Sequence, residues 1–258
     1  MNETLTHRSE VTVSATYPAP RRIGGAVRPR LVTPPDYSLW AIDAELDDGA
    51  SLHWEGVHGE DAVYVLDGVL EVGGRRCPAG GVIIVEADVA AEARSIGASR
   101  IVHFGSRADV AVPGGSSGAP PIEGRGTPVF GPRGEFESGD PAGVHAVWFS
   151  DGTSPTCRLQ LLTVIAPAGH AGRSRVHSHS RDEIIYVIDG SLHMDEFHLD
   201  TFSAACVPAD RQYTLQSGPD GHRFLNFRAD VSEVTYEGGP PVRETALSRG
   251  GRTVADRR

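Results

Sequence analysis

The sequence predicts an all-β protein in which two β-barrels follow one another along the chain. Three observations predict this fold class: an internal repeat, short strand-like segments bounded by turn residues, and a high content of glycine (31) and proline (18). The length of 258 residues suffices for two domains of about 110–130 residues, each with its own core.

The internal repeat is found at an offset of 122 residues. Residues 61–68 (DAVYVLDG) match residues 183–190 (EIIYVIDG), and the match continues without a gap to Asp88 and Asp210. A gapless match of this length, with alternating apolar residues and a shared glycine, indicates two copies of one fold.

Both copies contain short segments that are typical of strands. These segments are rich in Val, Ile and Tyr, and Gly, Pro or Asp bounds them, with no 3.6-residue apolar period. The clearest are Ala62–Leu66, Gly81–Val85, Ile184–Ile188 and Ser203–Val207. Many short strands at even spacing favour a sandwich or barrel in each half.

The clearest chemical signal is the spacing of His177, His179 and Glu183. Residues i and i+2 of a strand project from the same face, so both imidazoles can enter one cavity, and Glu183 begins the next strand. Two histidines and one carboxylate form a ligand set for Fe, Mn, Ni, Zn or Cu. Arg175 shares the parity of the histidines and is expected to hold an anionic substrate group.

This run resembles the first conserved motif of the cupin superfamily, because six residues separate Glu183 from Gly190. Gly172 leaves four residues before His177, where the family pattern has five. The second family motif is less complete: Pro208 fits, Asp210 stands in place of a glycine, and Tyr213 stands where a histidine belongs.

The resemblance covers residues of about 50–105 and 160–228. It implies a double-stranded β-helix (jelly-roll-like) barrel in each half, two in tandem, and one divalent metal bound by His177, His179 and Glu183. For Tyr213 two interpretations stay open: a phenolate ligand or proton donor at the metal, or a side chain that only fills the space of the missing histidine.

The N-terminal copy has lost the ligand set. The repeat offset aligns Glu55, Val57, Asp61 and Ala91 with the metal residues and Tyr213, and neither valine nor alanine can coordinate a metal. We therefore expect this barrel to be structural. The remaining polar residues near the motif are interpreted as structural or surface groups: His53, His58 and Glu60.

Other residues are assigned no role in the predicted site. The histidines outside the motif are interpreted as structural or surface groups: His145, His170, His193, His198 and His222. Gln160 and His193 are the two that could line the cavity. Cys77, Cys157 and Cys206 lack any close spacing and are interpreted as buried free thiols.

The composition also predicts the domain limits. Residues 1–105 are expected to form an N-terminal arm and the degenerate barrel, 106–134 a Pro/Gly-rich linker, 135–237 the metal-binding barrel, and 238–258 a polar tail. The net charge of −10 argues against a nucleic-acid partner. The absence of a signal peptide and of a long apolar run predicts a cytoplasmic protein without membrane contact, and a homodimer or higher homo-oligomer is expected.

The function most favoured by these residues is that of an Fe(II)-dependent dioxygenase or other oxygenase acting on a small organic substrate in the C-terminal barrel, with Arg175 and Tyr213 as catalytic residues. The first alternative is a non-redox metal enzyme, such as an isomerase, cyclase, lyase or aminohydrolase, with Mn, Zn, Ni or Cu in place of Fe. The second alternative is a protein that binds a metal and a small molecule without turnover.

Overall fold

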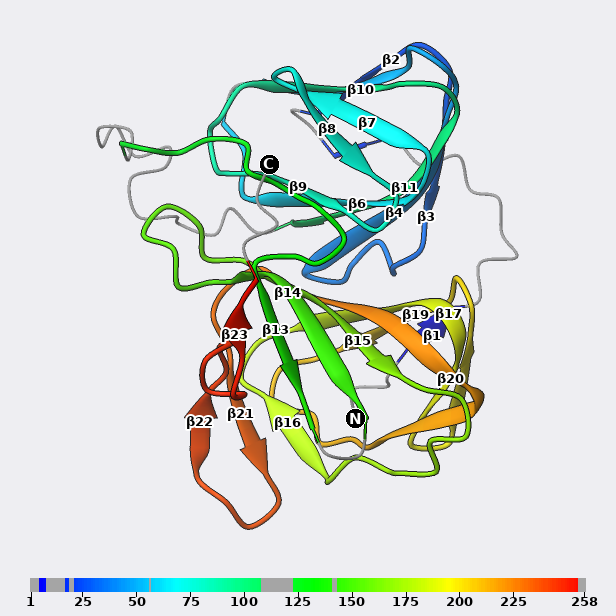
Figure 1. The fold of residues 1–258 in the computed structure, drawn as a ribbon, viewed down its shortest axis with the longest axis vertical. Coiled ribbons are helices and arrows are strands. Elements are labelled where there is room, and N and C mark those ends of the chain that lie inside the picture. Colours follow the sequence, from blue (N-terminus) through cyan, green and yellow to red (C-terminus); the bar gives the residue numbers. More distant parts are fainter. Residues whose placement is uncertain are drawn as a thin grey trace. The chain divides into compact units, whose positions relative to one another are not determined.

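The computed structural model describes residues 5–7, 17–18, 21–55, 57–107, 123–140 and 143–254. They form two compact units of antiparallel strands (Figure 1), the N-terminal unit within residues 17–134 with 154–157 and the C-terminal unit from residues 5–7, 135–153 and 158–254. The described residues contain no helix, and the all-β prediction is confirmed. Accordingly, no helix in those ranges could cross a membrane.

The N-terminal unit consists of two antiparallel sheets (Figure 1). The six-stranded sheet has the order β12-β9-β6-β11-β4-β3 and the five-stranded sheet the order β2-β5-β10-β7-β8. The strands are β2 (Arg22–Gly24), β3 (Val27–Leu31), β4 (Leu39–Leu46), β5 (Ser51–Trp54), β6 (Asp61–Asp67), β7 (Val69–Val72), β8 (Arg75–Pro78), β9 (Val82–Val85), β10 (Ala91–Ser95), β11 (Ser99–Ser106) and β12 (Val129–Phe130).

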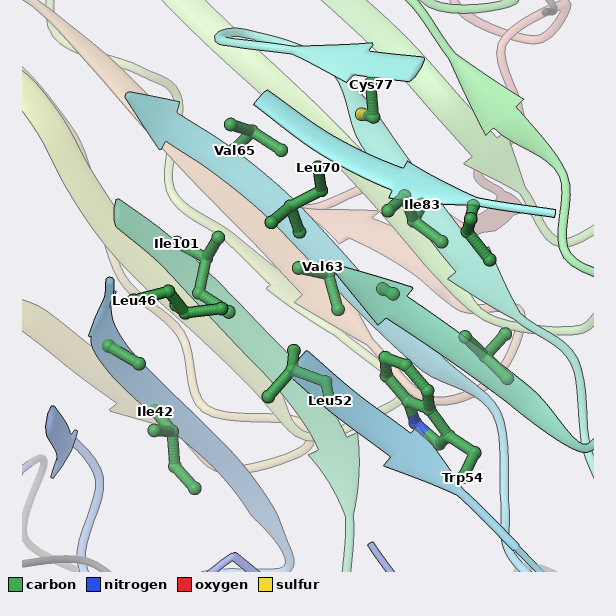
Figure 2. Packing of buried hydrophobic residues seen from close by; sticks show 14 of the residues in the cluster. Ile42, Leu46, Leu52, Trp54, Val63, Val65, Leu70, Cys77, Ile83 and Ile101 are labelled. Atoms are coloured by element: carbon green, nitrogen blue, oxygen red, sulfur yellow. The ribbon is translucent and has the colours of Figure 1, made fainter. Parts of the chain in front are cut away.

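The core of this unit lies between its two sheets. Alternate residues of β4, β6, β9 and β11 meet residues of β5, β7 and β10, as the side chains in Figure 2 show. Ile42, Val63 and Ile101 come from the six-stranded sheet, and Leu52 and Leu70 from the five-stranded one. This two-residue alternation between core and exterior is what two packed sheets require.

The C-terminal unit has a nine-stranded sheet in the order β1-β19-β17-β20-β15-β14-β13-β23, with β18 paired to β17, and a three-stranded sheet β16-β21-β22 (Figure 1). The strands are β1 (Leu5–His7), β13 (Phe136–Gly139), β14 (His145–Asp151), β15 (Gln160–Ala166), β16 (His177–His179), β17 (Glu183–Met194), β18 (Phe197–Asp200), β19 (Ala204–Val207), β20 (Leu215–Arg228), β21 (Glu233–Tyr236), β22 (Pro241–Arg243) and β23 (Arg252–Thr253).

The repeat seen in the sequence reappears in strand register. Asp61 pairs with Val85 in one unit, and Glu183 pairs with Val207 in the other. Both pairs have the offset of 122 residues, and the four predicted strands lie in β6, β9, β17 and β19. The two copies therefore align their acidic residues at the first position of an equivalent strand.

The shared glycine of the repeat is required by backbone geometry. Gly68 and Gly190 have φ of 80° and 68°. A Cβ at Gly68 would lie 2.4 Å from the carbonyl oxygen of Ala98, and one at Gly190 would lie 2.2 Å from that of Gly221. Both the left-handed conformation and the close backbone approach exclude a side chain. Asp210, in place of the motif glycine, also has positive φ (62°), which aspartate tolerates better than most residues.

The boundaries expected from composition differ from the observed ones. Residues 129–130, inside the predicted linker, form β12 and pair with β9, while 108–122 lie outside the described residues. The predicted polar tail contains β22 and β23, and its Glu244 and Ala246 are buried. Strand β1, from the predicted N-terminal arm, pairs with β19 of the C-terminal unit. Composition detects flexibility of the backbone but not the long-range pairing that fixes it.

A positive φ alone costs a residue with a side chain roughly 1–2 kcal/mol. We predict that Gly68→Ala and Gly190→Ala each destabilise the protein by more than this, because the neighbouring backbone must also move to make room for the Cβ. The measurement is the midpoint of urea unfolding. Gly74→Ala is the matched control, since Gly74 has φ of 75° with no atom within 4 Å of its Cβ position. Equal losses in all three variants would contradict the role of the close approach.

Candidate functional site

Strand β16 carries the two histidines of the predicted motif. It pairs with β21, so that His177 lies opposite Tyr236 and His179 opposite Val234. The two imidazole rings are 5.3 Å apart between centroids, and both residues are buried. The strand therefore presents both rings to the interior of one barrel, as the i, i+2 spacing predicts.

Glu183 begins β17 and is fully buried (0% exposed). Its carboxylate accepts hydrogen bonds from Tyr213 Oη, from Asn226 Nδ2 at 2.9 Å, and from Nε and Nη2 of Arg228 at 3.1 and 2.8 Å. Burial raises the pKa of Glu183, but His179, Arg228 and the hydrogen bonds outweigh it and lower the pKa overall. Glu183 is therefore ionised, and donors from the protein itself surround it.

Strand register explains why Arg228 reaches this carboxylate. Arg228 pairs with Gln160 of β15, and it lies one residue beyond the Ile184–Phe227 pair, next to Glu183. The guanidinium also donates to Glu244 Oε2 at 2.8 Å and to His179 Nε2 at 3.1 Å. One arginine thus joins two buried carboxylates and one imidazole.

Glu244 completes the charge balance of this cluster. Burial raises its pKa, but the charge of Arg228 and the contact with His179 lower the pKa well below the ordinary value. Arg249 adds a second guanidinium 2.5 Å from Glu244 Oε1. Two carboxylates and two guanidinium groups therefore neutralise each other in this cluster.

Tyr213 lies beside His177, where the second motif would have a histidine. The two residues exchange backbone hydrogen bonds of 3.1 and 2.9 Å, and their rings are 4.4 Å apart. The phenol donates to Glu183 Oε1, and burial together with the charge of Glu183 raises the pKa of Tyr213 well above its ordinary value. Tyr213 is thus a neutral hydrogen-bond donor rather than a phenolate.

His177 has a fixed tautomer. Its Nδ1 is 2.8 Å from the carbonyl oxygen of Arg175, so Nδ1 carries the proton and Nε2 keeps a free lone pair. Burial lowers the pKa of His177 and favours the neutral ring. The guanidinium of Arg175 lies 4.7 Å from the ring centroid of Tyr236, which orients it at the cavity.

A cavity of about 660 Å³ opens onto these groups within the C-terminal unit. His177, His179, Tyr213, Arg175 and Arg228 all line it, whereas Glu183 lies behind them. The following residues, which the sequence interpretation left structural or on the surface, also line it: His145, His170 and His222. His193 and Gln160 do not line it.

His222 and Ser217 form a further polar pair on this cavity. Ser217 Oγ is 3.0 Å from His222 Nδ1. Burial, together with the nearby His170, lowers the pKa of His222 to about 4. His222 is therefore a neutral side chain near pH 7.

Most donor atoms of the predicted ligand set are already engaged by other groups of the protein. The oxygens of Glu183 accept four hydrogen bonds, and His179 Nε2 faces Arg228. Only His177 Nε2 keeps its lone pair. Among the described residues, no group of three or more histidine, cysteine, aspartate or glutamate side chains is arranged to hold a metal ion. In this arrangement the residues do not fit a divalent metal, because Arg228 already contacts both Glu183 and His179.

The N-terminal unit neutralises its equivalent carboxylate in a parallel way. Asp61 is fully buried and accepts two hydrogen bonds of 2.6 Å from Arg21, one of 2.6 Å from Trp54 Nε1, and lies 3.2 Å from His103 Nε2. In this unit Gly105 of β11 stands at the position equivalent to Arg228 of β20, and it pairs with Trp40. A Cβ at Gly105 would lie 2.4 Å from the Trp40 indole, so the guanidinium has to come from another segment.

Sequence reasoning missed three functional residues: Asn226, Arg228 and Glu244. Asn226 and Arg228 share a face of β20 with Phe224, and polar residues at alternate positions of an otherwise apolar run (FLNFR) are a usable signal of an inward polar cluster. No comparable signal marks Glu244, which reaches the site only through the folding of the C-terminal segment.

Solved structures with the cupin fold resemble this chain. An oxalate decarboxylase from Lactobacillus farciminis, solved as a formate complex, superposes with a TM-score of 0.62 at 14% identity, covering 87% of this chain and 90% of that one. A putative glyoxylate-induced protein from Pseudomonas aeruginosa gives 0.63 at 14% identity, covering 86% and 93%. A cupin 2 conserved barrel domain protein from Leptotrichia buccalis gives 0.50 at 11% identity, covering 79% and 88%.

These likenesses establish the cupin fold, which the sequence resemblance implied, and nothing finer. No protein-family model matches the chain. No curated protein matches it either.

We predict that Asp61→Asn destabilises the protein by about 3–5 kcal/mol at pH 7, because the buried guanidinium of Arg21 then faces a neutral amide in place of a carboxylate. Burial raises the pKa of Asp61, but Arg21 and His103 depress it well below its unfolded value. The stability from Asp61 is therefore full above the unfolded pKa of about 4 and is lost as the pH falls below it. The measurement is urea unfolding of both proteins at pH 7 and at pH 3.

The control is Asp47→Asn, which removes an exposed ion pair with Arg28 and is expected to change the stability little, because solvent screens that pair. A loss of unfolding free energy for Asp61→Asn as small as that of the control would refute the role of the Arg21–Asp61 pair. A loss as large at pH 3 as at pH 7 would refute it as well.

Proposed function

We propose that the C-terminal barrel is the active site of a non-redox enzyme that transfers protons on a small organic anion. The observation that carries this proposal is the position of Arg228, whose guanidinium contacts Glu183 and His179 of the predicted ligand set. It supplies there the fixed positive charge that a bound cation supplies in a metal site. The catalytic groups are then side chains that bind, hold or move protons.

His177 is the proposed proton acceptor. Its protonated Nδ1 is held by the Arg175 carbonyl, which leaves Nε2 as the lone pair available to a substrate. A general base of this kind needs a fixed orientation as much as a suitable pKa, and the backbone contact provides it.

Tyr213 and Glu183 are the proposed partners of that base. The phenol donates to Glu183, so it stays protonated beside His177 and is oriented by a carboxylate that Arg228 and Asn226 hold in place. To stabilise negative charge that develops on the substrate, Tyr213 turns its single O–H from Glu183 to the substrate. Arg175 is proposed to bind the acidic group of the substrate.

A metal-dependent enzyme, including the Fe(II) oxygenase favoured by the sequence, is the second candidate. One observation favours it: His179 Nε2 and Glu183 Oε2 are 3.9 Å apart, so the two residues would come close to a shared ion if Arg228 turned away. Fe, Mn, Zn, Ni and Cu all suit such a set. A protein that binds its ligand without turnover is the third candidate.

Proton transfer is tested by solvent deuterium exchange. We expect protein treated with a chelator and kept anaerobic to exchange the hydrogen next to the carboxylate of a substrate acid, followed by NMR over a panel of organic acids. His177→Gln and Tyr213→Phe should lower the rate by about 100-fold or more each. Turnover that requires Fe(II) and consumes dioxygen would establish the oxygenase instead, and tight binding without exchange or product would establish a binding protein.

Arg228→Met tests whether the guanidinium excludes a metal. We predict that Mn²⁺ or Zn²⁺ does not stabilise the wild type but stabilises Arg228→Met, because Glu183 and His179 then lose the guanidinium that contacts them, whereas Glu244 keeps Arg249. An ion at 100 times its Kd adds about 2.7 kcal/mol to the free energy of unfolding, which thermal melts detect. Arg223→Met, at an exposed arginine of the same strand, is the matched control and should not respond.

Elemental analysis of untagged wild type covers the case in which Arg228→Met does not fold. Less than stoichiometric metal agrees with the proposal. About one metal per chain, absent from the His177→Ala/His179→Ala double variant, would overturn it.

Assembly and location stay predictions from the sequence. A homodimer or larger homo-oligomer in the cytoplasm is expected, and sedimentation velocity of the purified chain measures the first of these.

A further inference from the structure

The cavity of the C-terminal unit is larger than a minimal organic acid requires. Its volume of about 660 Å³ lies in the range of sites that enclose drug-sized ligands. A two-carbon dicarboxylate would occupy a small part of it. The side chains around the remaining space therefore indicate which further chemical groups the ligand has.

One side of the cavity is cationic. Arg173 and Arg175 line it, and neither has an acidic partner within 4.0 Å among the described residues. Arg173 donates to Thr214 Oγ1 at 2.8 Å, and Arg175 stacks on Tyr236. Both guanidinium groups are thus oriented but not neutralised, in a protein whose net charge is −10. Such a pair recognises a carboxylate or another oxyanion.

Another side of the cavity is apolar, and strand register builds it. Leu162 and Val164 of β15 pair with Asn226 and Phe224 of β20, and Trp148 of β14 pairs with Leu162. Because these residues alternate along neighbouring strands, Trp148, Leu162, Val164 and Phe224 face the cavity together. The three strands lie next to one another in Figure 1.

We infer that the ligand of this cavity is an amphipathic organic acid, whose carboxylate meets Arg173 and Arg175 and whose aromatic or branched alkyl body packs on Trp148, Leu162, Val164 and Phe224. The inference rests on the proposed function only for the location of the site. It names the substrate class, and it holds whether or not the bound acid is turned over.

The two surfaces act on different parts of such a ligand. Burying an apolar body contributes about 25 cal/mol per Å² of surface removed from water, which supplies affinity. The two arginines are exposed, so they add less affinity than a buried pair but fix which end of the ligand enters near His177. A ligand that lacks either part leaves one of the two surfaces unused.

Calorimetric titration of the full-length protein tests the inference. The probes are phenylacetate and 4-methylpentanoate, compared with acetate and oxalate, which lack an apolar body, and with phenylacetamide, which lacks the charge. We expect the two amphipathic acids to bind at least about tenfold more tightly than acetate, oxalate and phenylacetamide. Arg175→Gln should weaken the binding of phenylacetate by about tenfold and leave the binding of phenylacetamide unchanged. Val164→Thr should weaken the binding of both aromatic probes.

The matched control is Arg181→Gln, at an exposed arginine that pairs with Asp230 and does not line the cavity; it should bind as the wild type does. Oxalate or acetate binding as tightly as phenylacetate, equal binding of the neutral amide, or no binding of either amphipathic acid at millimolar concentration would each overturn the inference. Binding of the acids without deuterium exchange would instead refute the proposed function and leave the ligand class standing.

Discussion

A buried carboxylate at the first position of a central strand, and the guanidinium that neutralises it, is the interaction on which both units depend. Asp61 and Glu183 are both 0% exposed, and an ionised carboxylate in that position is very costly without a countercharge. Arg21 and Arg228 provide it at 2.6 and 2.8 Å. A pair of this kind adds little net stability over apolar residues, but the loss of one partner is strongly destabilising. Each barrel therefore requires its arginine for stability.

The repeat meets this constraint with two different arginines because one strand differs in register. Relative to the offset of the other strands, β20 is displaced by one residue from β11: His103 pairs with Val63, but Asn226 pairs with Ile185. The place of Arg228 thus belongs to Gly105 in the N-terminal unit, where the Trp40 indole lies against the glycine. In the N-terminal unit a tryptophan fills this space. In the C-terminal unit a charged network occupies it and opens onto a cavity.

The sequence was sufficient for the fold class and for the residues that share a barrel wall. Strand alternation and the repeat predict the all-β fold, and the i, i+2 spacing brings His177 beside His179. What could not be predicted is the guanidinium that contacts His179 and Glu183. Motif spacing indicates which donors can converge but not which cation they meet. Arg228 at the end of β20 and Glu244 just after β22 lie 45 and 61 residues from Glu183 in the chain.

The identity of that cation limits the chemistry of the site. A metal ion exchanges ligands and offers an open position to substrate or dioxygen. A guanidinium can do neither, since its charge is permanent and its contacts are directional hydrogen bonds. It can hold Glu183 ionised, while burial and the charge of Glu183 raise the pKa of Tyr213 and keep it protonated beside the unprotonated nitrogen of His177. The proposed proton transfer relies on this neutral phenol and neutral imidazole side by side, and the carboxylate that orients the phenol is held by Arg228 rather than by the histidine motif alone.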